Sequence, residues 1–279
     1  MIKIENNIVF DGIKESKSLP GMADINDDNY YDDKTYITNS MLGKLADHPE
    51  TLKAYLEQGI GESSSALSMG DALHKGMLEP EKFNTMIRVW SQADWPEPTK
   101  TIRTGVNKQW VWDFKNANKD NCVLEDREFD TVNHCIDSFK AKPEAMKWLD
   151  DAVYEQIALG VVNGLPMKSK GDILRNDEWL VDIKSTSDIS LDAFKMSCNK
   201  YGYKRQGAMY RKMFGKKRFG FLIVEKKFPF KVAFYELSDE ALLQGERELE
   251  SLIDEYNYYF KDEDFFADKT KEHVMTGTI

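Results

Sequence analysis

The residues of this chain that could carry out chemistry together lie between positions 155 and 184. They are Glu155, Asp172, Asp182 and Lys184, and they stand in segments rich in strand-forming residues. Carboxylates are hard oxygen ligands that suit Mg²⁺ or Mn²⁺. An ammonium group beside them can position or help to deprotonate a water and can stabilise charge on a phosphate. This set of residues predicts metal-assisted hydrolysis of a phosphodiester.

A predicted β-hairpin brings two of these carboxylates together. Asn163-Gly164 is typical of a two-residue loop, and strand-like segments flank it at 153–162 and 165–174. Counting outward from this loop places Glu155 opposite Asp172, so both side chains leave the same face of the sheet. Like charges opposite each other are costly, and a bound divalent metal would remove the repulsion.

A third short strand, residues 179–183, adds Asp182 and Lys184, which are two positions apart and share a face. If the preceding loop has three residues centred on Asp177, Asp172 pairs with Asp182. Other loop lengths shift this register by one residue and turn the side chains apart.

Helical patterns surround these strands. Thr38 or Ser40 can cap a helix that runs to Leu56, and a second helix carries His74 and ends at Pro80. Further helices are expected around Trp110 and Trp112, over 129–139, over 191–214, and from Ser238 to Phe260, with another strand pair at 219–224 and 232–235. We expect residues 1–33 to be an irregular arm, residues 34–262 one α/β domain with a helical N-terminal portion, and residues 263–279 an acidic, loosely held tail.

Composition indicates a soluble intracellular protein. The 279 residues carry a net charge of -10, yet residues 168–230 hold 15 Lys and Arg against 7 Asp and Glu, which allows a basic working surface on an acidic body. The start of the chain lacks the pattern of a signal peptide, and no apolar run is long enough for a membrane span. The 3 cysteines, Cys122, Cys135 and Cys198, are far apart, which favours reduced thiols in the cytoplasm over a metal cluster.

The acidic residues and their flanks resemble the PD-(D/E)XK nuclease superfamily. Glu155, Gly171-Asp172 and Asp182-Ile183-Lys184 fit its signature, with Gly171 where the family often has Pro. The segment from Gln206 to Tyr210 resembles the Q-x-x-x-Y motif of the RecB-type branch. The segments 37–40, 67–74, 78–83, 182–186 and 201–206 resemble the exodeoxyribonuclease VIII (RecE-like) exonucleases of phages and prophages.

The resemblance implies a restriction-endonuclease-like α/β core, with a central mixed β-sheet flanked by helices. It also implies a Mg²⁺-dependent exonuclease, for which Mn²⁺ would substitute. Such an enzyme degrades one strand of linear double-stranded DNA in the 5′ to 3′ direction and leaves 3′ single-stranded ends. Expected partners are DNA ends, a RecT/Beta-like single-strand annealing protein used in recombination, and further copies of the chain in a trimeric or tetrameric ring.

The resemblance also implies roles for individual residues. His74, Asp172, Asp182 and the Ile183 carbonyl would hold the metal. Glu155, Lys184, Gln206 and Tyr210 would complete the catalytic site, and Gln206 and Tyr210 share a helix face because they are four residues apart. The expected phosphate contacts are Arg103, Lys204, Arg205, Arg211 and Lys212. Trp110 and Trp112 could wedge against bases, although packing in a core or at a subunit interface fits their pattern better.

Two other readings stay open at this point. An endonuclease of the same fold, either structure-specific or of the restriction type, would use the same residues and would also cut closed circular DNA. A non-catalytic scaffold that binds DNA ends would keep the fold without hydrolysis. The intact set of Asp172, Asp182 and Lys184 argues against the scaffold, since degenerate relatives have usually lost one of the three. An iron–sulfur exonuclease of this fold is excluded, because its cluster needs four cysteines and this chain has 3 that are far apart.

Overall fold

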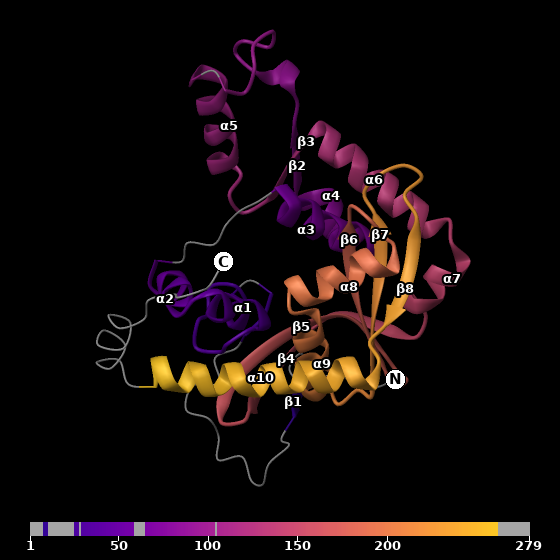
Figure 1. Cartoon of the computed structure of the whole chain (residues 1–279). Coiled ribbons are helices and arrows are strands. Elements are labelled where there is room, and N and C mark those ends of the chain that lie inside the picture. Colours follow the sequence, from indigo (N-terminus) through magenta and orange to yellow (C-terminus); the bar gives the residue numbers. More distant parts are fainter. Residues whose placement is uncertain (1–7, 11–24, 28, 59–64, 104, 262–279) are drawn as a thin grey trace.

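The computed structural model describes residues 8–10, 25–27, 29–58, 65–103 and 105–261. Its main sheet contains β1 (Ile8–Phe10), β4 (Ala152–Val162), β5 (Leu165–Arg175), β6 (Trp179–Thr186), β7 (Arg218–Glu225) and β8 (Val232–Glu236). The strand order is β1-β4-β5-β6-β7-β8, with parallel pairs β1/β4 and β6/β7 and antiparallel pairs elsewhere. The prediction of a central mixed sheet flanked by helices is confirmed (Figure 1).

Helices pack on both faces of this sheet. One face carries α1 (Asn39–Asp47), α2 (Pro49–Gln58), α8 (Leu191–Lys200), α9 (Tyr203–Phe214) and α10 (Asp239–Phe260). The other carries α3 (Ser65–Leu78), α6 (Asp126–Lys140) and α7 (Pro143–Met146), with α4 (Pro80–Met86) following α3. Along β7, Phe219 and Phe221 join the first core while Leu222 and Val224 join the second. This alternation follows from the two-residue period of a strand that is buried on both faces.

The predicted hairpin forms with the expected register. Val162 pairs with Leu165, and Gln156 pairs with Gly171 farther out, while Asn163 and Gly164 both have the positive φ that this loop needs. The loop after β5 has the three residues expected around Asp177, because Leu174 pairs with Leu180 and Ile173 pairs with Val181. The local turn chemistry therefore set the relative positions of three strands.

Two helix predictions were wrong in extent. The helix predicted to run from Thr38 to Leu56 is two helices, since α1 ends at Asp47 and α2 begins with Pro49. Proline fits the first turn of a helix but interrupts a helix that is already running. The helix predicted over 191–214 is also two helices, α8 and α9, separated at Gly202, whose φ of 64° lies in the left-handed region.

A small module was predicted only in part, because the helix around Trp110 and Trp112 was expected but its two strands were not. Strands β2 (Ile87–Trp90) and β3 (Cys122–Glu125) pair in parallel, and α5 (Gly105–Ala117) and the short 3₁₀ turn η1 (Gln92–Asp94) lie between them. In Figure 1 α5 and its connections project from the top of the molecule, away from the main sheet. The module has its own apolar cluster, formed by Trp90, Trp95 and Val111 with Trp110, Phe114 and Val123.

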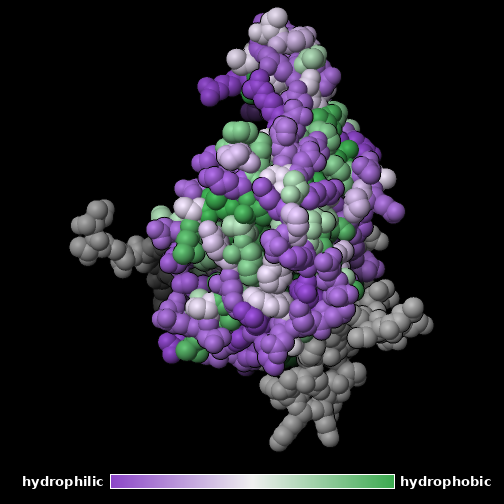
Figure 2. Space-filling view, turned by 90° about the vertical axis from the view of Figure 1, so that its right-hand side faces the viewer, coloured by the Kyte–Doolittle hydropathy of each residue, from purple (hydrophilic) through white to green (hydrophobic). Residues whose placement is uncertain are grey.

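The surface agrees with this division into body and projection. On the face shown in Figure 2, apolar residues gather across the middle of the body, while the projection at the top is mainly hydrophilic. Every described helix is too short or too polar to span a bilayer.

The predicted ends of the chain lie mostly outside the described residues. Within the arm expected at 1–33 to be irregular, Ile8–Phe10 forms strand β1 beside β4, so that part of the prediction was wrong. Ile25 and Tyr30 are buried against β4 residues Ile157 and Leu159. The predicted tail, 263–279, lies outside the described residues.

The 3 cysteines are buried free thiols.

Candidate active site

The site lies where two neighbouring strands separate. In β5 and β6 only Ile173 and Leu174 pair with Val181 and Leu180; farther along, β5 continues with β4 and β6 continues with β7. Asp172 is the first β5 residue beyond the last pair, and its Oδ2 accepts a hydrogen bond from Ile183 N at 2.6 Å. A buried peptide N–H needs a partner, and here a side chain replaces the lost strand neighbour. The separation of the strands thus fixes a carboxylate at the opening.

Glu155 lies next to Asp172 in an unusual backbone conformation. Its φ is 52°, and the pair Glu155–Asp172 is absent from a ladder that is regular on both sides. Such a conformation costs a non-glycine residue of order 1–3 kcal/mol and persists only where its surroundings impose it. The predicted register was therefore right, and the site interrupts the hydrogen bonding at that single position.

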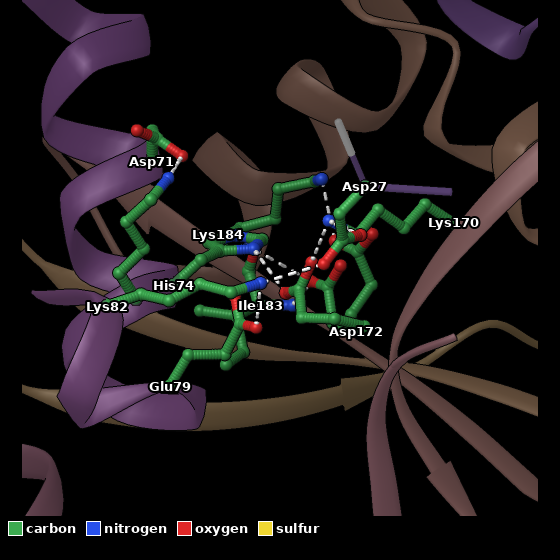
Figure 3. Close-up of polar contacts among 12 residues, drawn as sticks. Asp27, Asp71, His74, Glu79, Lys82, Lys170, Asp172, Ile183 and Lys184 are labelled. Carbon is green, nitrogen blue, oxygen red and sulfur yellow. Dashed lines mark hydrogen bonds and ion pairs between the residues drawn. The ribbon is translucent and has the colours of Figure 1, made fainter. Parts of the chain in front are cut away.

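His74 reaches the same point from α3. Its Nε2 lies 3.0 Å from the Ile183 carbonyl oxygen, and its Nδ1 lies 3.5 Å from Asp172 Oδ2 and 3.7 Å from Glu155 Oε1 (Figure 3). His74, Glu155 and Asp172 each offer a ligand atom, and these atoms lie within 4.8 Å of one another. The structure thus brings together His74, Ile183 and Asp172 from the predicted metal set.

Asp182 and Lys184 lie on β6 beside these groups. Lys184 Nζ is 2.6 Å from Asp182 Oδ2, and Gln206 Nε2 donates to Asp182 Oδ1 at 2.6 Å. Tyr210, one turn along α9 from Gln206, lines the same cleft and is largely buried, which raises the pKa of its hydroxyl well above the ordinary value. All six predicted catalytic residues are therefore found in one cleft, which has a volume of about 1950 Å³.

The charges of the site compensate one another unevenly. Burial, with the nearby charge of Asp182, raises the pKa of Asp172 to about 7. Burial opposes the charged form of His74, but Asp172 and Glu155 outweigh it and raise the pKa of His74 to about 9. For Glu155, the contacts with His74 and Lys170 outweigh burial and lower its pKa to about 2. Asp182 outweighs burial at Lys184 and raises the pKa of that ammonium.

These properties fit a divalent cation. Glu155 Oε1 is buried without a hydrogen-bond partner, and Asp172 ionises only at the expense of repulsion from its acidic neighbours. A cation held by carboxylate oxygens would give Glu155 Oε1 a partner and would offset the repulsion between Asp172 and its acidic neighbours. His74, Glu155 and Asp172 are the side chains placed to hold it, with Asp182 adjacent.

Gly171 has a packing role that the sequence did not reveal. A Cβ at this position would lie 3.0 Å from a Leu180 methyl carbon and 3.1 Å from the Phe214 ring. The structure shows that β5 passes too close to its neighbours for a larger residue without a shift.

Of the predicted phosphate contacts, Arg205 lines the cleft of the catalytic set and the others lie outside its lining. Arg205 is 2% exposed, and its guanidinium binds Asn39 and Glu248. Lys204 donates to Gln244 at 2.8 Å and Arg211 to Glu246 at 2.9 Å, so both face α10. Arg103 is exposed in the projecting module. Arg211 and Lys212 line a separate, smaller cavity, while Trp110 packs in the module's own core and Trp112 is 59% exposed.

Sequence reasoning missed Lys170, whose Nζ lies 2.9 Å from Glu155 Oε2. It precedes Asp172 by two residues on the same strand, so the alternation that grouped Asp182 with Lys184 could have found it. Its second partner, Asp27 at 3.0 Å, comes from the N-terminal segment and had no local signal.

Comparison with known proteins agrees with this fold. Residues 38–267 match the model of a family described as a PDDEXK-like domain of unknown function (DUF3799). The chain belongs to this family. No curated protein matches it.

Solved structures resemble this PDDEXK-like chain to different degrees. The "Putative exonuclease" from Eubacterium rectale matches with a TM-score of 0.62 and 17% identity, covering 92% of this chain and 96% of that one. A phage related exonuclease from Haemophilus somnus matches with a TM-score of 0.30 and 12% identity over 55% of this chain and 82% of that one. An alkaline exonuclease from Laribacter hongkongensis matches with a TM-score of 0.30 and 12% identity over 69% and 97%. The first match shows a shared fold over nearly the whole chain, and the PDDEXK-like fold supports a nuclease function.

Proposed function

We propose that this protein is a Mg²⁺-dependent 5′ to 3′ exonuclease of linear double-stranded DNA. The observation that carries the proposal is the convergence of Glu155, Asp172, Asp182 and Lys184 in one cleft, with His74 beside them. The 3′ single strand that it leaves would serve a single-strand annealing protein in phage recombination, and a ring of identical subunits in the cytoplasm is the expected assembly. The polarity, the annealing partner and the ring rest on the RecE-like resemblance. Mn²⁺ is expected to replace Mg²⁺.

In the mechanism, Asp172, Glu155 and His74 would hold the cation, with Asp182 completing the acidic wall. When bound, the ion would supply Lewis-acid stabilisation of the charge that develops on the scissile phosphate. Metal ligation requires ionised carboxylates and a neutral imidazole, so binding displaces the protons held by Asp172 and His74.

Lys184 has a distinct part in this mechanism. Its raised pKa keeps the side chain an ammonium at neutral pH, which suits charge stabilisation and the orientation of a water better than proton abstraction. Gln206 positions Asp182 by donating to Oδ1, which leaves Oδ2 to Lys184. Arg103, Lys204 and Arg211 stay proposed as DNA contacts. For Lys204 and Arg211 the contact requires exchanging a partner on α10 for a phosphate, whereas Arg205 serves the proposal by fixing α9 to α1 and α10.

The test is digestion of linear duplex DNA labelled at either the 5′ or the 3′ end, with Mg²⁺, with Mn²⁺ and with EDTA. We expect metal-dependent loss of the 5′ label, abolished by Asp182→Asn and retained by Asp192→Asn, a control in which an exposed carboxylate of α8 is neutralised. Early loss of the 3′ label would refute the polarity. Cleavage of closed circular DNA would favour the endonuclease, and binding of DNA ends without cleavage would favour the scaffold.

A further inference from the structure

Two lysines at the mouth of the site share one carboxylate from a distant segment. Asp27 Oδ1 lies 3.0 Å from Lys170 Nζ on β5, and Asp27 Oδ2 lies 2.7 Å from Lys82 Nζ on α4 (Figure 3). Each oxygen binds a lysine from a different element, so the carboxylate bridges the two. The remaining partners of the lysines are also acidic, Glu155 for Lys170 and Glu79 for Lys82.

Asp27 has an accessible side chain, although Ile25 and Tyr30 nearby in the chain are buried. Ile25 is 1% exposed and Tyr30 is 5% exposed, and both pack against Ile157 and Leu159 of β4. The side chains of Asp27 and Lys82 are 40% and 41% exposed. A ligand can therefore replace the Asp27 carboxylate by a side-chain rotation, without moving the buried residues on either side.

The pair of lysines belongs to the same cleft as the acidic residues. Asp27, Lys82 and Lys170 all line it, and Lys170 Nζ is 2.9 Å from Glu155 Oε2. A ligand held by both lysines would lie directly beside the carboxylates. The chemistry required is an anion with at least two oxygens that can each accept a hydrogen bond from an ammonium group. A phosphate meets this requirement and is the anion that the backbone of a nucleic acid presents at each nucleotide.

We propose that Lys82 and Lys170 form a binding site for a backbone phosphate of the nucleic acid, and that Asp27 occupies this site until the nucleic acid displaces it. The identity of the ligand rests on the proposed function, but the binding step does not require hydrolysis. Asp27 then acts as a competitor built into the chain. Its removal should strengthen phosphate binding, and that gain should depend on Lys82.

The experiment uses the full chain and a fluorescently labelled duplex oligonucleotide in EDTA, with fluorescence anisotropy as the readout. We expect Asp27→Asn to bind about 5- to 10-fold more tightly than the unmodified protein, within the usual range of coupling between competing ligands. Glu144→Gln is the matched control, because it also removes one negative charge, from an α7 residue whose ion pair with Lys147 is exposed. It should change binding less than about 2-fold.

A double-mutant cycle isolates the site. Lys82→Gln should weaken binding, and Asp27→Asn should give no gain when Lys82→Gln is also present, whereas Lys82→Arg should preserve the gain. Inorganic phosphate is the second probe. It should displace the duplex from Asp27→Asn at a lower concentration than from the unmodified protein if the site accepts any phosphate. A difference confined to the duplex would assign the site to the nucleic-acid backbone.

The proposal is overturned if the gain from Asp27→Asn equals that of Glu144→Gln, or if it survives in the double variant. The digestion of labelled DNA separates this result from the proposed function. Cleavage with no effect of Asp27 on binding would refute the phosphate site alone. A gain that depends on Lys82, in a protein that cleaves no DNA with any metal, would refute the nuclease alone.

Discussion

Replacing Asp172 with asparagine should make the metal-free protein more stable while removing its response to metal. The folded structure raises the pKa of Asp172 from 3.8 to about 7. Protonated Asp172 is therefore favourable for the folded state relative to the ionised carboxylate. This contribution to stability is fully present below about pH 4 and is lost as the pH rises through 7. Each pKa unit corresponds to 1.36 kcal/mol, so the ionised form costs about 4 kcal/mol above neutral pH.

Asparagine avoids this cost because it stays neutral and its amide oxygen can still accept from Ile183 N. The lost attraction between Asp172 and the protonated His74 reduces the gain, so about 4 kcal/mol is an upper limit. Since 1 kcal/mol shifts the Tm of a domain of 150–250 residues by roughly 2–4 °C, the increase at pH 8 has an upper limit of roughly 8–16 °C. At pH 4 the two proteins should be equally stable.

The assay is thermal unfolding in EDTA and in saturating Mg²⁺ or Mn²⁺, at pH 4 and pH 8. Metal at 100 times its Kd should stabilise the unmodified protein by about 2.7 kcal/mol and leave Asp172→Asn unchanged. Glu225→Gln is the control, because Glu225 is also buried but accepts from Ile189 N at 3.4 Å and lies 3.4 Å from Lys231 Nζ. This control should lose about 1–3 kcal/mol and keep its response to metal.

Two results would refute this reasoning. If Asp172→Asn unfolds at a lower temperature than the unmodified protein in EDTA at pH 8, the ionised carboxylate of Asp172 does not destabilise the folded protein. If metal stabilises Asp172→Asn as much as the unmodified protein, Asp172 does not hold the ion.

Three further predictions concern the pH dependence of metal binding, the support of Asp182 and the packing of α9 against α10. The affinity for Mn²⁺, measured by calorimetry, should fall as the pH drops below about 9 and more steeply below about 7, because protons compete first for His74 and then for Asp172; equal affinity at pH 6 and pH 8 would contradict this. Gln206→Ala should weaken metal binding or cleavage roughly 10- to 100-fold by releasing Asp182 Oδ1, and Gln206→Glu should not restore it, because an ionised carboxylate cannot donate to Oδ1. Gly245→Ala should lower stability by about 1–3 kcal/mol or more, because its Cβ would lie 2.1 Å from the Lys204 carbonyl oxygen; an unchanged Tm would show that α9 and α10 can separate freely.

The sequence predicted those parts of the site that depend on local chain geometry. The Asn163-Gly164 turn and the three-residue loop around Asp177 fix the register of β4, β5 and β6, and that register brings Asp172 beside Glu155 and Asp182. The positive φ of Glu155 could not be predicted in this way. It arises where β5 leaves β6, a feature that depends on the packing of the whole sheet.

The limits of helix prediction have a similar origin. The apolar periodicity continues through His48 and through Gly202, so the apolar pattern alone predicts one continuous helix across each of these positions. Pro49 and the left-handed φ of Gly202 interrupt the backbone while the buried face carries on. The second interruption matters for the site, because it turns α9 so that Gln206 meets Asp182.

The basic residues of α9 show why charge alone does not reveal which cations already have a partner within the protein. Arg205 binds Glu248 and Asn39, Arg211 binds Glu246, and Lys204 binds Gln244, so three of the predicted phosphate contacts are matched by α10 and α1. The partners on α10 lie 35 to 43 residues later in the chain and Asn39 lies 166 residues earlier, so no helix spacing rule connects them to α9.

The cations that remain close to the carboxylates are therefore on the strands and on α4. Lys170 and Lys184 touch Glu155 and Asp182, and Lys82 is joined to Lys170 through Asp27. Each of them is balanced by acidic neighbours, so the cleft is close to neutral before a ligand enters. A nucleic acid can bind in such a cleft only by replacing carboxylates, and a metal ion that neutralises Glu155 and Asp172 would release lysine charge for phosphate at the same time. Metal and DNA should accordingly bind cooperatively, with a metal affinity that rises when DNA is present.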